Sequence, residues 1–153
     1  MSIERRVALV ETLFEQLEQE SRQFESTAGL SCVSSCGNCC TYADIEASPL
    51  EFLPWAFHLF LNGEAEKTRI LLRTNESATC FIYKPLTIVN QGRCSTYKYR
   101  GLICRLFGFA ANKDKYGNLR LSTCKIIKEG QTEQYKSAAD AISKGLYLSL
   151  IHI

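Results

Sequence analysis

The first thirty residues alternate apolar and charged positions with helical spacing. Apolar or small residues recur every three or four positions, which describes one stripe of an amphipathic helix, while Glu and Arg fill the other faces. Ser2 is a suitable N-cap, and the pattern stops at residues 27–29. The stripe is only three heptads long, which favours packing on the protein's own core over pairing with a coiled-coil partner. The stripe consists of Ile3, Val7, Val10, Phe14, Leu17, Ser21 and Phe24.

A second apolar segment begins after a turn. Ser48-Pro49-Leu50-Glu51 forms a capping-box pattern with proline at the first helical position. Pro54 interrupts the segment, so we predict a short turn followed by a helix over residues 54–61. That helix has little polar face, which favours a place in the core over a docking surface. A third, shorter helix is predicted over residues 64–73. The apolar positions of the second helix are Trp55, Phe57, Leu59 and Phe60, with Leu53 just before it.

After Asn75 the pattern changes to short β-type pieces. We predict strands at residues 80–83, 87–89 and 94–97, and a hairpin in which residues 107–110 and 119–121 flank the turn sequence 115–118. A last helix begins near Thr132. The sequence therefore predicts an α+β fold, in which long N- and C-terminal helices surround cysteine-rich loops and short β-strands. The apolar face of the last helix consists of Tyr135, Ala138, Ile142, Leu146 and Ser149.

Length and composition narrow the class of protein. At 153 residues the chain suits a single domain over 1–153, and 46% hydrophobic residues exclude a disordered chain. No signal peptide or membrane span is recognisable, so we expect a cytoplasmic protein without a membrane partner. The eight cysteines change the picture, because thiols in a reducing compartment are metal ligands more often than disulfide partners.

Four of the cysteines fall within nine positions, as Cys32-x3-Cys36-x2-Cys39-Cys40. Cysteines that serve only as small buried hydrophobes tend to scatter, whereas a bend at residues 37–38 can turn several thiolates onto one ion. Adjacent Cys39 and Cys40 point in different directions in most backbone conformations, which favours two ions or two corners of a cluster. The other four lie too far apart for a zinc knuckle and must be gathered by tertiary structure. They are Cys80, Cys94, Cys104 and Cys124.

Three sharper interpretations of the cysteine motif are excluded. The Cys-x3-Cys-x2-Cys spacing occurs in radical-SAM enzymes, but those need a barrel longer than this chain. Cys36-Gly-Asn-Cys39 lacks the surrounding βαβ unit of a thioredoxin-like site. None of the cysteines precedes a proline, so the bacterial ferredoxin pattern is absent.

Charge is unevenly distributed along the chain. Residues 1–51 hold nine acidic and three basic side chains, whereas residues 80–128 hold one acidic and ten basic ones. A basic segment can bind nucleic acid, but no nucleic-acid-binding motif accompanies this one. We therefore expect no specific nucleic-acid partner, and interpret the positive charge as stabilising thiolates.

The order of the cysteines resembles the YkgJ family of bacterial cysteine-cluster proteins, which is described as zinc- or iron-chelating. The resemblance covers about residues 30–126, and includes a Tyr97-x2-Arg100 signature before Cys104 and the helix start at residues 48–51. Gly101 departs from the family, which usually has proline there; this should loosen the turn before Cys104. All eight family cysteines have counterparts here: Cys32, Cys36, Cys39, Cys40, Cys80, Cys94, Cys104 and Cys124.

The resemblance implies a metal-binding protein whose eight cysteines hold zinc or iron. A related cysteine cluster is associated with flagellin lysine methylation, so the alternative is an iron–sulfur cluster enzyme or accessory subunit that acts on another protein. Tyr97, Arg100 and Arg105 are candidates for bonding or neutralising thiolate sulfur. His58 is better explained as a packed histidine than as a ligand, and His152 carries no argument.

Overall fold

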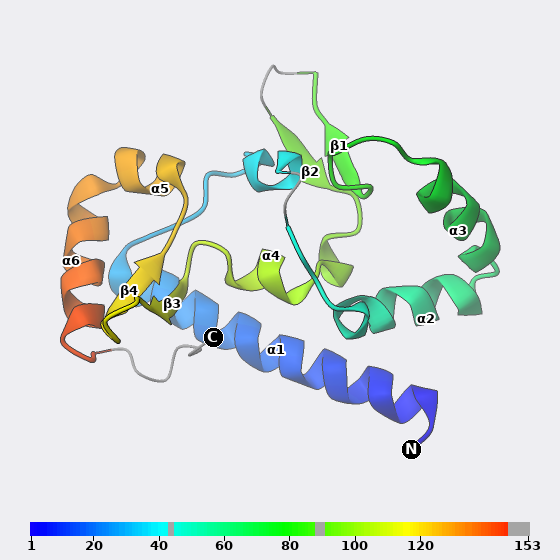
Figure 1. The fold of residues 1–153 in the computed structure, drawn as a ribbon, viewed down its shortest axis with the longest axis horizontal. Helices are drawn as coiled ribbons and strands as arrows, with labels where there is room; N and C mark the ends of the chain where they lie inside the picture. The colour runs from blue at the N-terminus through cyan, green and yellow to red at the C-terminus, as the bar shows by residue number, and fades with distance from the viewer. Residues whose placement is uncertain (43–44, 88–90, 147–153) are drawn as a thin grey trace. The chain divides into compact units, whose positions relative to one another are not determined.

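The computed structural model describes residues 1–42, 45–87 and 91–146 of the chain. Its contacts divide the chain into two compact units. One comprises Met1–Phe14 and Ser35–Cys104, and the other comprises Glu15–Ser34 and the residues from Arg105 onward. Helices and two small antiparallel sheets make up both units, which confirms the α+β class (Figure 1). The interpretation of residues 1–153 as one domain stays a prediction.

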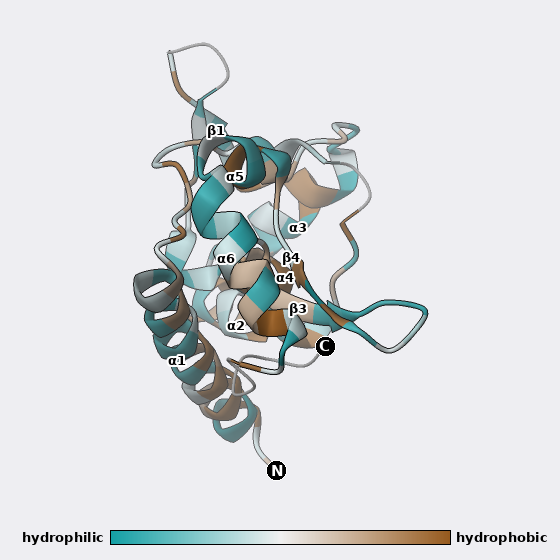
Figure 2. Cartoon of the chain, turned by 90° about the vertical axis from the view of Figure 1, so that its left-hand side faces the viewer, coloured by the Kyte–Doolittle hydropathy of each residue, from teal (hydrophilic) through white to brown (hydrophobic). Residues whose placement is uncertain are grey.

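The first helix, α1, spans Ile3–Ala28 and contributes to both units. The backbone N–H of Arg5 donates to the Ser2 side chain at 3.3 Å, so the predicted N-cap is confirmed. Hydrophobic and hydrophilic residues alternate along the helix, as Figure 2 shows. The predicted stripe is buried at Val7, Phe14, Ser21 and Phe24, while Ile3 at the helix start is exposed.

The second unit contains a core of buried hydrophobic residues. Strands β3 (Ala110–Lys113) and β4 (Leu119–Ser122) form an antiparallel hairpin, followed by α5 (Lys125–Gly130) and α6 (Thr132–Ser143). Phe24 meets Phe109 edge to face, with ring centroids 6.4 Å apart. The core consists of Phe24, Leu30, Phe109, Ala111, Leu121, Ile127, Ala138 and Ile142.

The predicted hairpin and last helix are confirmed in this unit. The Asp114 carboxylate accepts hydrogen bonds from the backbone N–H groups of Tyr116 and Asn118 and so fixes the turn. The first strand begins only at Ala110, because the chain at residues 107–109 is still turning out of a short helix. On the last helix Ala138 and Ile142 face the core as predicted, but Leu146 is exposed. Ser149 lies outside the described residues.

The first unit is built from short elements. Two 3-10 turns, η1 and η2, precede the helices α2 and α3, and a small antiparallel sheet, β1 with β2, leads through a third turn, η3, into α4 (Figure 1). The predicted capping box and the two predicted helices are confirmed. The bounds are η1 Asn38–Thr41, η2 Pro49–Phe52, α2 Leu53–Leu61, α3 Ala65–Thr74, β1 Tyr83–Pro85, β2 Gly92–Cys94, η3 Tyr97–Tyr99 and α4 Leu102–Leu106.

Two expectations for this unit are wrong. The predicted strands at residues 80–83 and 94–97 keep only Tyr83 and Cys94 in β-structure, because turns on both sides confine the sheet to three residue pairs. Residues 88–89 of the predicted middle strand lie outside the described residues. Helix α2 is not central to a core: Pro54 is its only buried residue, and Phe60 and Leu61 are 69% and 66% exposed. Its inner side is covered instead by an aromatic row in which Trp55 contacts Phe52 and Phe81.

The structure also contains two helices that the hydrophobic pattern did not predict, α4 and α5. None of the helices in the described residues is both long and apolar enough to cross a membrane.

Candidate metal centre

The loop that carries the first cysteines is fixed against the small sheet of the first unit. The backbone N–H of Gly92, in β2, donates to the carbonyl of Ser35 at 3.0 Å. Gly37 adopts a left-handed conformation with φ 59°, and a Cβ there would lie 2.6 Å from the Tyr83 ring and 2.9 Å from the Gly92 carbonyl. Only glycine fits such an approach, so the Cys36-Gly-Asn-Cys39 segment depends on Gly37 for its position.

Backbone hydrogen bonds bring later cysteines to this loop. The N–H of Cys80 donates to the carbonyl of Cys40 at 2.9 Å, and the N–H of Tyr83 donates to the carbonyl of Cys80 at 3.0 Å. Across the sheet Tyr83 pairs with Cys94. Three segments that are distant in sequence are thus joined, with Cys40, Cys80 and Cys94 close to their junctions.

Cys39 and Cys40 interact directly. The Cys40 thiol donates a hydrogen bond to the Cys39 sulfur, which lowers the pKa of Cys39 to about 6. The same bond raises the pKa of Cys40 well above its ordinary value, because the donated proton must be lost. The expectation that the two side chains point apart is therefore wrong. Both cysteines lie in the 3-10 turn η1.

Electrostatic interactions connect five thiols of the first unit. Negative charge on Cys39, Cys80 and Cys104 contributes to the raised pKa of Cys40. Loss of hydration is the main cause that raises the pKa of Cys104 to about 11, with contributions from three of the other thiols. Loss of hydration also raises the pKa of Cys94, to which Cys80 contributes. These thiols influence one another's ionisation and would repel one another if all were ionised. We call Cys39, Cys40, Cys80, Cys94 and Cys104 the thiol cluster.

Glu51 is distant from Cys104 in the sequence, but it holds the start of the helix that carries this cysteine. Its carboxylate accepts hydrogen bonds from the N–H groups of Ser48 at 2.7 Å and Leu102 at 2.8 Å. The second bond caps the first turn of α4, which carries Cys104. Gly101 leaves little room here, since a Cβ would lie 3.1 Å from the same carboxylate. The turn before Cys104 is therefore closely packed, and the expectation that glycine loosens it relative to proline stays a prediction.

The sequence analysis recognised Glu51 only as half of a capping box. Its bond to the start of α4 spans 51 residues and has no local sequence pattern. The single available signal was that the helix start at residues 48–51 belongs to the family resemblance although it contains no cysteine.

The three residues that we expected to bond or neutralise thiolate sulfur have different surroundings. The Arg100 guanidinium stacks on the Tyr97 ring, 3.8 Å from its centroid, and its charge acts to lower the pKa of Cys94. Arg105 instead forms an ion pair with Glu18 at 2.6 Å, and its side chain is only 6% exposed. Arg100 therefore fits the role of offsetting thiolate charge, whereas Arg105 is accounted for by ion pairing within the second unit.

His58 is packed as expected. Its ring stacks on Tyr99 at a centroid distance of 4.9 Å, and the Asn62 side-chain amide lies 3.0 Å from its Nε2. His152 lies outside the described residues.

The remaining cysteines have different environments. Cys36 lies in the docked loop of the first unit and is partly buried. Cys32 and Cys124 belong to the second unit. Cys124 has a structural role there: its sulfur accepts a hydrogen bond from the N–H of Ile127 at 3.4 Å, which caps α5, and its side chain packs against the core.

The chemistry of the donor set fits zinc or iron. All eight cysteines lie in the described part of the chain and form no disulfide with one another. Thiolate sulfur is the ligand that both zinc and iron–sulfur centres select. Among the described residues, no three Cys, His, Asp or Glu side chains already converge as the ligands of one ion do.

Comparison with known proteins gives one match. Residues 31–136 match the model of the CxxCxxCC family, whose description is "Putative zinc- or iron-chelating domain". No curated protein and no solved structure matches the chain significantly.

Proposed function

Since the chain belongs to the CxxCxxCC family of zinc- or iron-chelating domains, we propose that it binds zinc or iron through the thiol cluster and Cys36. In this proposal Cys39 and Cys40 supply adjacent ligands from one turn, and Cys80, Cys94 and Cys104 supply the others. The observation that carries it is the junction at Cys40, where the backbone of Cys80 bonds to the cysteine-rich loop.

The density of the thiols and their incomplete burial support a metal over ordinary packing, since Cys80 and Cys104 are exposed and the other thiols of the cluster are only partly buried. Small hydrophobic side chains gain nothing from lying where their ionised forms repel one another, whereas a divalent ion neutralises several thiolates at once. Arg100 supplies further positive charge close to Cys94. Because ligands come from distant segments, metal binding also contributes folding free energy.

Cys32 and Cys124 stay predicted ligands on the family resemblance. Cys124 also caps α5, and this contact explains a cysteine at that position without a metal. A cytoplasmic location suits the proposal, because a reducing compartment keeps thiols available for a metal.

We propose that the metal is bound as single ions and not as an iron–sulfur cluster. One experiment distinguishes the two. The ligands are gathered from several segments without a ferredoxin spacing, which favours single ions. The protein should therefore contain one or two zinc or iron ions per chain after anaerobic purification from cells supplied with both metals. Elemental analysis, acid-labile sulfide and a visible spectrum measure this.

The outcomes are distinct. Metal without sulfide supports single-ion chelation. Brown protein in which sulfide matches iron would replace this proposal with the iron–sulfur enzyme or accessory subunit. Protein without zinc or iron would contradict both.

A further inference from the structure

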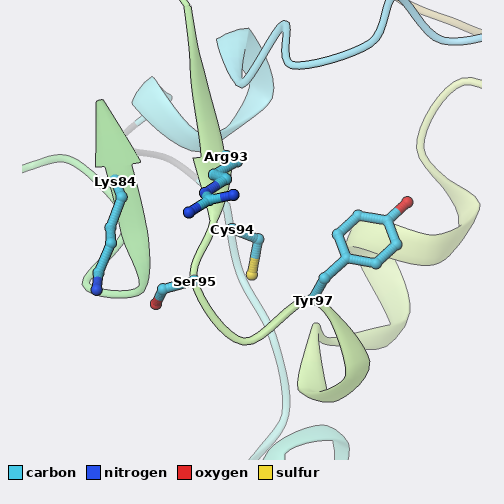
Figure 3. A pocket seen from close by; sticks show the side chains of 5 residues that line it. All are labelled: Lys84, Arg93, Cys94, Ser95 and Tyr97. Atoms are coloured by element: carbon cyan, nitrogen blue, oxygen red, sulfur yellow. The ribbon is translucent and has the colours of Figure 1, made fainter. Parts of the chain in front are cut away.

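A second site lies beside Cys94 on the small sheet of the first unit. A cavity of about 460 Å³ is lined by Lys84, Arg93, Cys94, Ser95 and Tyr97 (Figure 3). Its volume falls in the range of small-molecule binding sites, about 300–1,000 Å³. Lys84 and Arg93 come from neighbouring strands, and the Tyr97 side chain lies on the other side of Cys94 from Lys84.

The two cations of this pocket face each other unfavourably. Lys84 in β1 is directly paired with Arg93 in β2, and like charges at such positions destabilise an antiparallel sheet. Neither side chain forms an ion pair with any described residue, and the described residues that line the pocket include no carboxylate. Residues 80–105 contain five basic side chains and no acidic one. The arrangement costs stability in the free protein and therefore suggests that something else supplies negative charge.

We propose that this pocket binds a small organic anion that carries two or more negatively charged oxygens, as carboxylates or phosphate. Arg93 and Lys84 would hold the oxygens, because a guanidinium binds such groups in two-point fashion and an ammonium adds a point charge. The Ser95 hydroxyl donates to the carbonyl of Ile82 at 2.9 Å, so it shapes the wall without donating to the anion. Neither cation is a proposed metal ligand, although Cys94, which also lines the pocket, is one.

The shape of the pocket argues for an organic ligand over a bare ion. A phosphate alone occupies a small part of this volume, which leaves room for a carbon skeleton. The Tyr97 ring forms one wall, and its stacking with Arg100 fixes its position. An anion bound here lies next to Cys94 and adds negative charge beside that thiol.

The test measures anion binding to the full chain as purified with its metal. Two probes distinguish carboxylate from phosphate ligands. Tricarballylate carries three carboxylates without the chelating hydroxyl of citrate, and glycerol 2-phosphate carries a phosphate. Calorimetry at low salt should detect one of them binding once per chain, with glycerol inert. Lys84→Gln and Arg93→Gln should each weaken that binding by about tenfold or more.

Matched controls come from α3 of the same unit. Lys67→Gln and Arg73→Gln remove the same charges outside the pocket and should leave the affinity within about twofold. Arg93→Gln should also raise or preserve the melting temperature of the anion-free protein, since it relieves the facing charges. Failure of wild type to bind either probe would overturn the proposal. So would equal weakening in all four variants, because that indicates only diffuse charge. Metal content, measured in parallel, should stay unchanged.

Discussion

Gly37→Ala is expected to lower the free energy of unfolding by about 2–4 kcal/mol. A left-handed conformation costs an L-residue about 1–2 kcal/mol. At Gly37 the new methyl group also meets the Gly92 backbone at 2.9 Å, so the loop must move away from the sheet. Because that loop carries Cys36, Cys39 and Cys40, the variant should also lose bound metal. Anaerobic denaturant unfolding and elemental analysis measure the two effects.

Gly63→Ala is the matched control. Gly63 lies in the same unit and has φ 71°, but a Cβ there meets nothing within 4 Å. It should therefore show only the conformational cost, about 1–2 kcal/mol, and keep its metal. If Gly37→Ala were no more destabilising than Gly63→Ala, the close docking of the cysteine loop on β2 would be refuted.

Cys39→Ser is expected to remove most of the bound metal and to destabilise the protein. Structural zinc contributes about 10–16 kcal/mol in small metal-dependent domains, so losing part of it should cost on the order of 3 kcal/mol or more. Serine also cannot replace the thiolate in the Cys39–Cys40 hydrogen bond. Metal content and melting temperature should fall together.

Cys124→Ser provides the contrast. Serine is a good N-cap, so the cap of α5 should survive the change and the melting temperature should stay close to that of wild type. If the thiol cluster and Cys36 suffice for the metal, this variant also keeps its metal content. A loss equal to that of Cys39→Ser would make Cys124 a ligand, and a stable Cys39→Ser protein with full metal would reject the cluster as the site.

Elements with a long repeating pattern could be predicted from the sequence. The apolar stripe of α1 extends over about six turns, and the caps at Ser2 and Ser48 are local signals that the structure confirms. The hairpin at residues 110–122 was equally recognisable from its turn chemistry. Each of these depends on residues within a few positions of one another.

What the sequence could not predict depends on non-local contacts. Helix α4 is only five residues long, too short to show a period, and Glu51 caps it from 51 positions away. Phe60 and Leu61 are exposed although α2 is almost wholly apolar, and composition cannot reveal which side of such a helix is covered. The facing pair of Lys84 and Arg93 exists only because of the sheet register.

The candidate site could likewise be predicted from the sequence only in part. Spacing alone singled out the four cysteines of the first loop as unusual. It gave the wrong relation between Cys39 and Cys40, because spacing does not show that two adjacent side chains interact with each other. It also showed Cys80 only as one of four distant cysteines that tertiary structure must gather. A backbone bond to Cys40 now makes Cys80 a central part of the proposal.

X-ray absorption at the edge of the bound metal tests the central claim most directly. The account predicts that the full chain, purified anaerobically, shows a first shell of about four sulfur atoms at about 2.3 Å from zinc or iron. A first shell dominated by nitrogen or oxygen at about 2.0–2.2 Å would contradict it, because the thiol cluster would then not be the ligand set.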